Sequence, residues 1–417
     1  MSTSPVIEKY IARYCEPLAN DLARLTLALL PAEKVYHNCL LVPAFDEVDL
    51  HRIWQAITGQ SQLILILLNA PHTASQAAVS RTKAVTNQLA AQYKQLAHCQ
   101  STQARLPLFA IEQARIITIE LTESLPPGQG IGLARKLLAD LTIQLWQQAR
   151  LASMWFVMTD SDAILPAQFW SELNCLTPSG PGLAVLPVVH ATNDPSLLSH
   201  ATKLYELWLR QYTQALGQAI PRYALTPLGS RFMIHVQTYC QVRGFPKRCA
   251  GEDFYFLNKC LLHAKVYPMS GPLITLRARL SKRTPFGTGP GVAKLLEQVV
   301  DCGELAAVPL FYQPACLRRW QQHLIDIRQE MLQGSVQVLA QLCQRYALLS
   351  PKQLTALVAQ LHQRGTVSQR LQLFYQTIDL LRCIQLLNRL HLGLLTYNQL
   401  HAELGSETIN TLKTTWF

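Results

Sequence analysis

The chain has 417 residues, of which 49% are hydrophobic and 15% charged, so it can bury a sizeable core in two or three domains, and long disordered segments are not expected. Its 37 Lys and Arg against 26 Asp and Glu give a net charge of +11. That charge favours phosphate-bearing partners, which could be nucleotides, nucleic acids or anionic lipids, and the charge alone does not distinguish among them. Eleven Cys without a Cys-x-x-Cys pair disfavour a disulfide framework or zinc ribbon and favour reduced thiols in a cytosol.

The sequence shows no export signal, because no basic stretch leads into an apolar run at the N-terminus. Its longest charge-free window, residues 53–80, is interrupted by Gln, Ser, Asn, Pro and His. It therefore falls short of the roughly 20 mostly apolar residues of a spanning helix. We expect a cytoplasmic protein, and its basic charge leaves peripheral contact with the inner face of a membrane open.

Five apolar runs predict buried strands, after a helical lead-in over residues 1–35. The runs are Cys39–Ala44, Leu63–Leu68, Ile116–Glu120, Met154–Met158 and Leu183–Val189. Helix-compatible stretches accompany them, at residues 47–58, 74–98, 130–150 and 166–174. Near-continuous apolar strands alternating with helices predict an α/β domain over residues 36–300, with a mostly parallel sheet covered on both faces by helices.

Residues 301–417 are rich in Leu and Gln and are predicted to be a helical C-terminal region. An apolar stripe there is formed by Leu371, Phe374, Ile378, Leu381 and Ile384. The stripe indicates a packed helical appendage, with a lipid- or partner-facing helix as the alternative.

Polar residues follow several of the predicted strands, and ligands of parallel sheets bind beyond these carboxyl ends. Asp46 and Asn69 follow the first two runs, and Thr159-Asp160-Ser161-Asp162 follows the fourth. Two carboxylates two residues apart suit Mg²⁺ or Mn²⁺, with phosphate oxygens completing the shell. The same pattern also occurs as ordinary turn chemistry, and both interpretations stand at this stage.

Glu252 and Asp253 precede an aromatic run that is predicted to be helical. Acids at this position stabilise the positive end of a helix. At the edge of a pocket, one of them could also act as a general base that takes a proton from an attacking hydroxyl.

A glycine-rich turn, Gly128-Gln-Gly-Ile-Gly, opens the helix that carries Ala134, Arg135 and Lys136. Such a turn presents backbone N–H groups to anions. It is not a Walker loop, since no Gly-Lys-Ser/Thr follows. Arg135 could bind a phosphate, or it could be a solvated residue of the helix.

The densest basic stretch runs from Arg277 to Arg283 and is followed by a loop rich in glycine. Its cations, Arg279 and Arg283 among them, suit a lid over a diphosphate or, equally, a solvated loop.

Five segments of the chain, taken in their order along the sequence, resemble those of the family-two, GT-A-type glycosyltransferases. The similar segments are Leu41-Val-Pro-Ala-Phe-Asp-Glu47, Gly130–Lys136, Thr159–Asp162, the stretch from Arg231 to Phe245, and Gly251-Glu252-Asp253. The resemblance covers about residues 36–290. It implies an inverting, metal-dependent enzyme of the hexosyltransferase type, which moves a sugar from a UDP- or GDP-linked donor to the hydroxyl of an unknown acceptor.

The resemblance also implies roles for individual residues. Donor-site residues would be Pro43, Ala44, Glu47, Asn69, Ala134, Arg135 and Asp160. Asp162 would bind Mg²⁺ or Mn²⁺, with Asp160 facing the ribose or the water shell of the metal. Asp253 would be the catalytic base, and Glu252 would orient the acceptor or the base.

Two positions depart from the family pattern. The second strand ends in Asn69 where the family usually has an acid that meets the nucleotide base, so the choice of base stays open. The usual Gln-x-x-Arg-Trp acceptor motif is missing, and Arg279 and Arg283 lie roughly where its cation would fall.

Three other functions compete with this one. A nucleotidyltransferase would need a basic, glycine-rich loop after the first strand, where this chain has acidic Phe45-Asp-Glu. A nucleic-acid-binding protein would explain the net charge but not the acids at strand ends, so no nucleic acid is expected as partner. A catalytically degenerate relative that only binds a nucleotide sugar remains an alternative.

Overall fold

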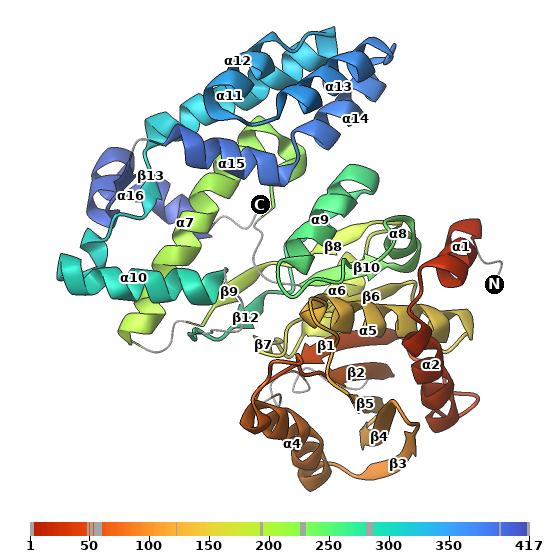
Figure 1. The fold of residues 1–417 in the computed structure, drawn as a ribbon. Coiled ribbons are helices and arrows are strands. Elements are labelled where there is room, and N and C mark those ends of the chain that lie inside the picture. Colours follow the sequence, from red (N-terminus) through yellow and green to blue (C-terminus); the bar gives the residue numbers. More distant parts are fainter. Residues whose placement is uncertain are drawn as a thin grey trace. The chain divides into compact units, whose positions relative to one another are not determined.

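The computed structural model describes residues 4–47, 50, 53, 61–121, 123–191, 195–225, 231–280, 287–391 and 393–414. The chain divides into two compact units (Figure 1). The first contains the described residues of 1–191 and 228–277, and the second those of 192–227, 278–282 and 287–417. Residues 195–225 thus belong to the second unit, although the sequence interpretation placed residues 36–300 in one domain.

A nine-stranded sheet forms the centre of the first unit. In spatial order its strands are β11 (Val266–Pro268), β8 (Leu183–Val185), β10 (Phe232–His235), β6 (Trp155–Met158), β1 (Asn38–Ala44), β2 (Gln62–Leu68), β5 (Ala114–Leu121), β4 (Ala104–Ile111) and β3 (Gln95–Gln100). Only β10 and β4 run against the direction of the others. The predicted α/β class with a mostly parallel sheet is therefore confirmed.

The middle of the sheet is the part that the sequence predicts best. β1 and β2 pair in parallel over their full length, from Asn38↔Gln62 to Ala44↔Leu68, and every residue of both strands is buried. Strands without an exposed residue are covered on both faces, which is why their sequences are almost purely apolar. β1, β2, β5 and β6 coincide with four of the five predicted runs to within a few residues at their ends.

The fifth run was wrong as a single strand. It breaks into β8 and β9 (Val188–His190), and β9 joins a separate three-stranded sheet with β12 (Ile274–Leu276) and β7 (Ala163–Ile164). The break falls at Leu186-Pro187, because proline has no N–H to donate to a strand ladder.

The predicted helix over residues 74–98 was too long. It ends as α4 (Gln76–Gln92), and residues 95–100 form β3, which pairs with the unpredicted β4. Of the predicted helix 47–58, only residues 47, 50 and 53 lie among the described residues.

The lead-in forms two helices, because a proline stands at the first position of each. Helix α2 packs on α5, and α5 packs on β1. The α-helices of the first unit are α1 (Pro5–Arg13), α2 (Pro17–Leu29), α4, α5 (Gly130–Gln147), α6 (Phe169–Leu176), α8 (Val236–Gln241) and α9 (Glu252–His263).

The second unit is mostly helical, with one short sheet of β13 (Phe311–Tyr312) and β14 (Leu394–Leu395). Its helices are α7 (Leu197–Ala219), η1 (Pro221–Tyr223), α10 (Thr288–Cys302), η2 (Leu305–Ala307), α11 (Pro314–Gln333), α12 (Gln337–Tyr346), α13 (Pro351–His362), α14 (Val367–Thr377), α15 (Leu380–Leu390) and α16 (Tyr397–Thr414). The predicted apolar stripe is shared by α14 and α15, with Phe374 and Ile378 fully buried where the two helices meet.

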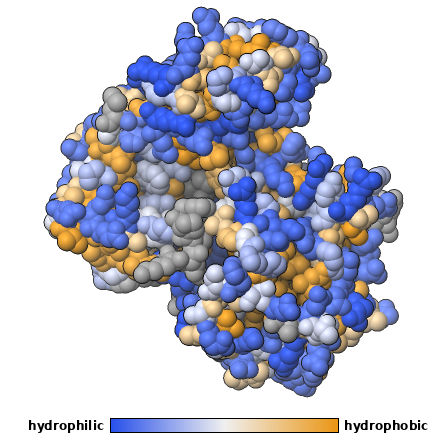
Figure 2. Space-filling model, in the orientation of Figure 1, coloured by the Kyte–Doolittle hydropathy of each residue, from blue (hydrophilic) through white to orange (hydrophobic). Residues whose placement is uncertain are grey.

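Within the described part of the chain, no helix has both the length and the apolar content needed to cross a bilayer. On the face drawn in Figure 2, hydrophobic residues lie in small patches between hydrophilic ones.

Candidate functional site

The carboxyl ends of β2, β1 and β6 lie next to one another along one edge of the sheet. From β1 the chain goes to β2 and β5 on one side and later returns to β6 on the other. Such a reversal of strand order opens a crevice at the carboxyl ends, where ligands of α/β sheets bind. The residues that follow these three strands are those that the sequence analysis singled out.

Arg135 of α5 brings two of the predicted acids together. Its Nη2 donates to Oδ1 of Asp160 at 2.5 Å, and its Nε lies 2.9 Å from Oε1 of Glu252. The contact with Glu252 is an ion pair without hydrogen-bond geometry. Three distant segments, the turn after β6, the second turn of α5 and the first turn of α9, thus converge at one guanidinium.

The cluster holds more negative than positive charge in a buried place. Arg135 is 4% exposed and Glu252 is 3% exposed. Burial, together with the neighbouring Asp253, raises the pKa of Glu252 to about 7, although Arg135 opposes the shift. Burial, and to a smaller extent the charge of Asp160, also raise the pKa of Asp253, and the positive charge of Arg135 opposes this rise. Nη1 of Arg135 has no hydrogen-bond partner among the described residues, so this buried N–H can still meet an anion or a water.

Two glycines explain how α5 and the segment before α9 come so close. The N–H of Gly132 donates to the carbonyl of Arg248 at 2.9 Å. A Cβ on Gly132 would lie 2.3 Å from the carbonyl oxygen of Pro246 and 2.5 Å from the nitrogen of Arg248. A Cβ on Gly130 would lie 2.9 Å from the Cα atom of Cys249. The predicted use of this turn for anions does not hold at Gly132, whose N–H is already occupied; the glycine there is needed for packing.

Asp160 and Asp162 lie on the turn directly after β6, and both are partly exposed. Mg²⁺ commonly takes one or two carboxylates and fills its shell with waters and phosphate oxygens. The two side chains fit that requirement, with Asp160 sharing one oxygen with Arg135. No group of three or more His, Cys, Asp or Glu side chains that could hold a metal lies within the described ranges.

Asn69 lies at the second strand end, where its N–H donates to the carbonyl of Ala44 at 3.1 Å. Its side chain is 4% exposed, and its Oδ1 has no hydrogen-bond partner among the described residues. It lines a cavity of about 50 Å³ between the ends of β2 and β5 and helix α4. The other lining residues are Leu68, Ala70, Val79, Thr82, Lys83, Glu120, Leu121, Glu123 and Ser124.

The remaining predicted donor residues are mostly buried. Pro43 and Ala44 are the last two residues of β1 and are buried, and Ala134 is fully buried in α5. Glu47 is 7% exposed just beyond β1. Their role in binding a donor stays a prediction.

The two predicted lid residues, Arg279 and Arg283, stay predictions. Arg279 is assigned to the second unit, whereas the cluster around Arg135 lies in the first. Arg283 lies outside the described residues.

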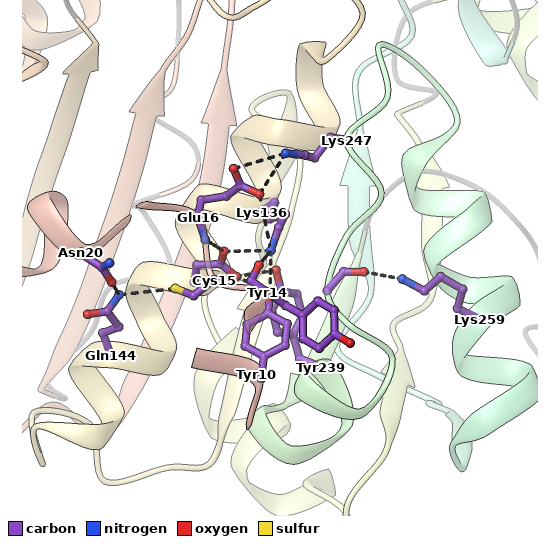
Figure 3. A network of polar contacts seen from close by, with 12 residues as sticks. Tyr10, Tyr14, Cys15, Glu16, Asn20, Lys136, Gln144, Tyr239, Lys247 and Lys259 are labelled. Atoms are coloured by element: carbon purple, nitrogen blue, oxygen red, sulfur yellow. Dashed lines mark hydrogen bonds and ion pairs between the residues drawn. The ribbon is translucent and has the colours of Figure 1, made fainter. Parts of the chain in front are cut away.

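Next to Arg135, Lys136 enters a buried polar network that the sequence analysis did not predict (Figure 3). Asp140, fully buried, accepts hydrogen bonds from Tyr10 Oη (2.6 Å), Tyr239 Oη (3.0 Å), Lys136 Nζ (2.9 Å) and the N–H of Glu16 (2.8 Å). Lys136 Nζ also donates to Tyr10 Oη. The network ties α1 and α8 to α5, and so fixes the helix that carries Arg135.

Replacing Tyr239 by Phe removes one donor to the buried Asp140, so we expect a loss of about 1.5 kcal/mol in the free energy of unfolding. Tyr36→Phe is the matched control, because the Tyr36 hydroxyl is buried without a partner among the described residues. It should cost less than about 0.5 kcal/mol. Urea unfolding compares the two, and equal losses would show that the bond to Asp140 contributes nothing.

Lys83, Glu120 and Glu123 line the cavity beside Asn69 and were not predicted as site residues. Glu120 stands at the end of a predicted strand and could have been found by that position. Lys83 could not, since its place depends on how α4 packs.

Comparison with known proteins does not assign this chain to a class. No protein-family model matches it, and no curated protein sequence shows a significant match.

Proposed function

We propose that the chain is a glycosyltransferase with a GT-A-like first unit, which transfers a sugar from a nucleotide diphosphate to an acceptor hydroxyl. The observation that carries the proposal is the meeting of Arg135, Asp160 and Glu252 at the reversal of strand order, with one buried N–H of Arg135 left for a ligand. A divalent cation bound at Asp162 would offset part of the negative charge of this cluster.

The spacing of the strand ends supports a nucleotide as the donor. Asn69 follows β2 and Asp160 follows β6, with β1 between them, so two strand spacings, roughly 10 Å, separate these positions. A nucleoside diphosphate has a similar length. The cavity beside Asn69 is only a water or two in size, since a water occupies about 30 Å³. It suits the polar edge of a base rather than a whole ring.

The charges support a diphosphate at the other end. Asp162, helped by Asp160, would hold Mg²⁺ or Mn²⁺, which would offset the charge that develops on the departing diphosphate. Nη1 of Arg135 is available to a phosphate oxygen, where a guanidinium forms strong, charge-assisted hydrogen bonds.

The burial of the two acids of α9 supports different roles for them. Glu252 is 3% exposed and paired with Arg135, so it suits positioning. Asp253 is partly exposed, and its raised pKa brings it nearer to the range of an effective base. In this mechanism Asp253 takes the proton of the acceptor hydroxyl. The acceptor oxygen bonds to the anomeric carbon, and the bond to the diphosphate breaks with its electron pair, which inverts the anomeric configuration.

Calorimetric titration with UDP, GDP and their sugar conjugates, with and without Mn²⁺, tests the donor site. We expect one nucleotide to bind in a metal-dependent manner, and Asp162→Asn to weaken binding at least about tenfold, as for the loss of a charged ligand contact. Asp326→Asn, at a partly exposed acid of the second unit, should bind like wild type. Absence of binding by the folded wild-type protein would refute the proposal.

One observation favours the alternative of a non-catalytic, nucleotide-sugar-binding protein. Oδ1 of Asp160 already accepts a hydrogen bond from Arg135. In addition, Asn69 stands where the family-two glycosyltransferases usually have an acid. Donor binding without turnover on any acceptor, and without hydrolysis, would indicate this function.

A further inference from the structure

We infer that a basic surface formed by Arg243, Lys247, Arg248 and Lys259 binds a phosphate group. We call these four residues the basic loop surface. They lie on the segment between α8 and α9 and on α9 itself.

The two arginines are held in place by tyrosines and not by acids. The guanidinium of Arg248 lies 3.8 Å from the ring centroid of Tyr255, and that of Arg243 lies 5.1 Å from the ring centroid of Tyr14. Neither forms an ion pair with an acid among the described residues. Both side chains are exposed, so their planar N–H groups face solvent and can bind an oxyanion in bidentate fashion.

The two lysines add positive charge, and one acid, Glu16, offsets that of Lys247. Lys247 lies 3.2 Å from Oε1 of Glu16, which is also 3.9 Å from Lys136 (Figure 3). Nζ of Lys259 donates to the carbonyl of Gly244 at 2.7 Å. Burial, and the nearby cations Lys136 and Arg243, lower the pKa of Lys259 to about 8. A bound anion would offset the repulsion that these two cations exert on Lys259.

The loop is rigid, which favours binding over a solvated role. Arg243 has φ of 60° and Gly244 has φ of 68°, so a bulky side chain is kept in the left-handed region that it disfavours. Gly244 packs on the buried network, since a Cβ there would lie 2.6 Å from the hydroxyl of Tyr10. The cations are therefore presented in a fixed arrangement.

The same segment leads directly to the candidate base. The carbonyl of Arg248 accepts from Gly132, three residues before Arg135, and Tyr255 lies two residues after Asp253. If the proposed transfer takes place, the phosphate belongs to the acceptor. That assignment rests on the proposed function, whereas binding of phosphate does not.

The test uses the full chain without any donor. Calorimetry with glycerol 3-phosphate, and flotation with phosphatidylcholine vesicles with and without phosphatidic acid, separate a soluble phosphate from a lipid headgroup. We expect Arg243→Gln/Arg248→Gln to weaken binding of the preferred probe more than about tenfold, since each lost charge-assisted bond costs that order. Arg318→Gln/Arg319→Gln, a pair of exposed arginines on α11, should bind like wild type.

A conservative variant and a folding control complete the test of phosphate binding. Arg248→Lys keeps the positive charge but loses the planar guanidinium that stacks on Tyr255. It should therefore bind the phosphate probe more weakly than wild type and more tightly than the double variant. Circular dichroism shows that each variant is folded. Equal binding by wild type and the double variant, or no binding of either probe by wild type, would overturn the inference. Nucleotide titration of the same samples shows independently whether the donor site exists.

Discussion

Asp253→Asn should lower the turnover of sugar transfer by about 10²–10⁴-fold, the usual effect of losing a general base, and leave donor binding almost unchanged. Asn keeps the shape of the side chain but cannot accept the acceptor proton. Since the base acts only in the transition state, kcat should fall and the dissociation constant of the nucleotide should stay within about twofold. Single-turnover kinetics and calorimetry on the same preparation separate the two effects.

Glu252→Gln is the control for this experiment. It removes the buried partner of Arg135, so its main effect should be on stability and on donor affinity through Arg135. If Glu252→Gln abolishes turnover in a stable protein while Asp253→Asn remains active, the roles of the two acids are exchanged. If both variants stay fully active, neither is the base.

The middle of the sheet could be predicted from the sequence because burial on both faces leaves an almost purely apolar run. β1 and β2 meet that condition at every residue. β3 does not, since its residues are mostly exposed and polar, and it was taken for the end of a helix. Pro187 was visible in the fifth run, but the sequence does not say that the strand after it joins another sheet.

The sequence predicted which residues follow the strands at the candidate site, but it did not predict which of their side chains contact one another. The acids of the turn after β6 could be placed because parallel strands carry their carboxyl ends to one edge. The pairing of Arg135 with Glu252 could not, because it depends on how closely α5 approaches the segment before α9. That approach is set by Gly132 and by the network around Asp140, whose members are far apart in the chain.

Arg135→Met should cost about 3–5 kcal/mol in the free energy of unfolding at neutral or higher pH, because it leaves ionised acids buried without their cation. The loss should depend on pH. The pKa of Glu252 is raised by burial to about 7, and that of Asp253 is raised too, above their unfolded values. Stability from these groups is therefore present at low pH and lost as pH rises through the folded pKa values.

Without Arg135 both pKa values should rise further, because the arginine opposes the effect of burial at both acids. Near pH 5 the variant would then keep both acids protonated and have little charge left unpaired, so its loss should be less than about half of that near pH 8. Urea unfolding at the two pH values measures this difference. Arg135→Lys keeps the positive charge but cannot reach Asp160 and Glu252 with one planar group, so its loss should be smaller and less dependent on pH. An equal loss for Arg135→Met at both pH values would mean that the arginine stabilises the protein through packing alone, and the charge balance assigned to the site would be wrong.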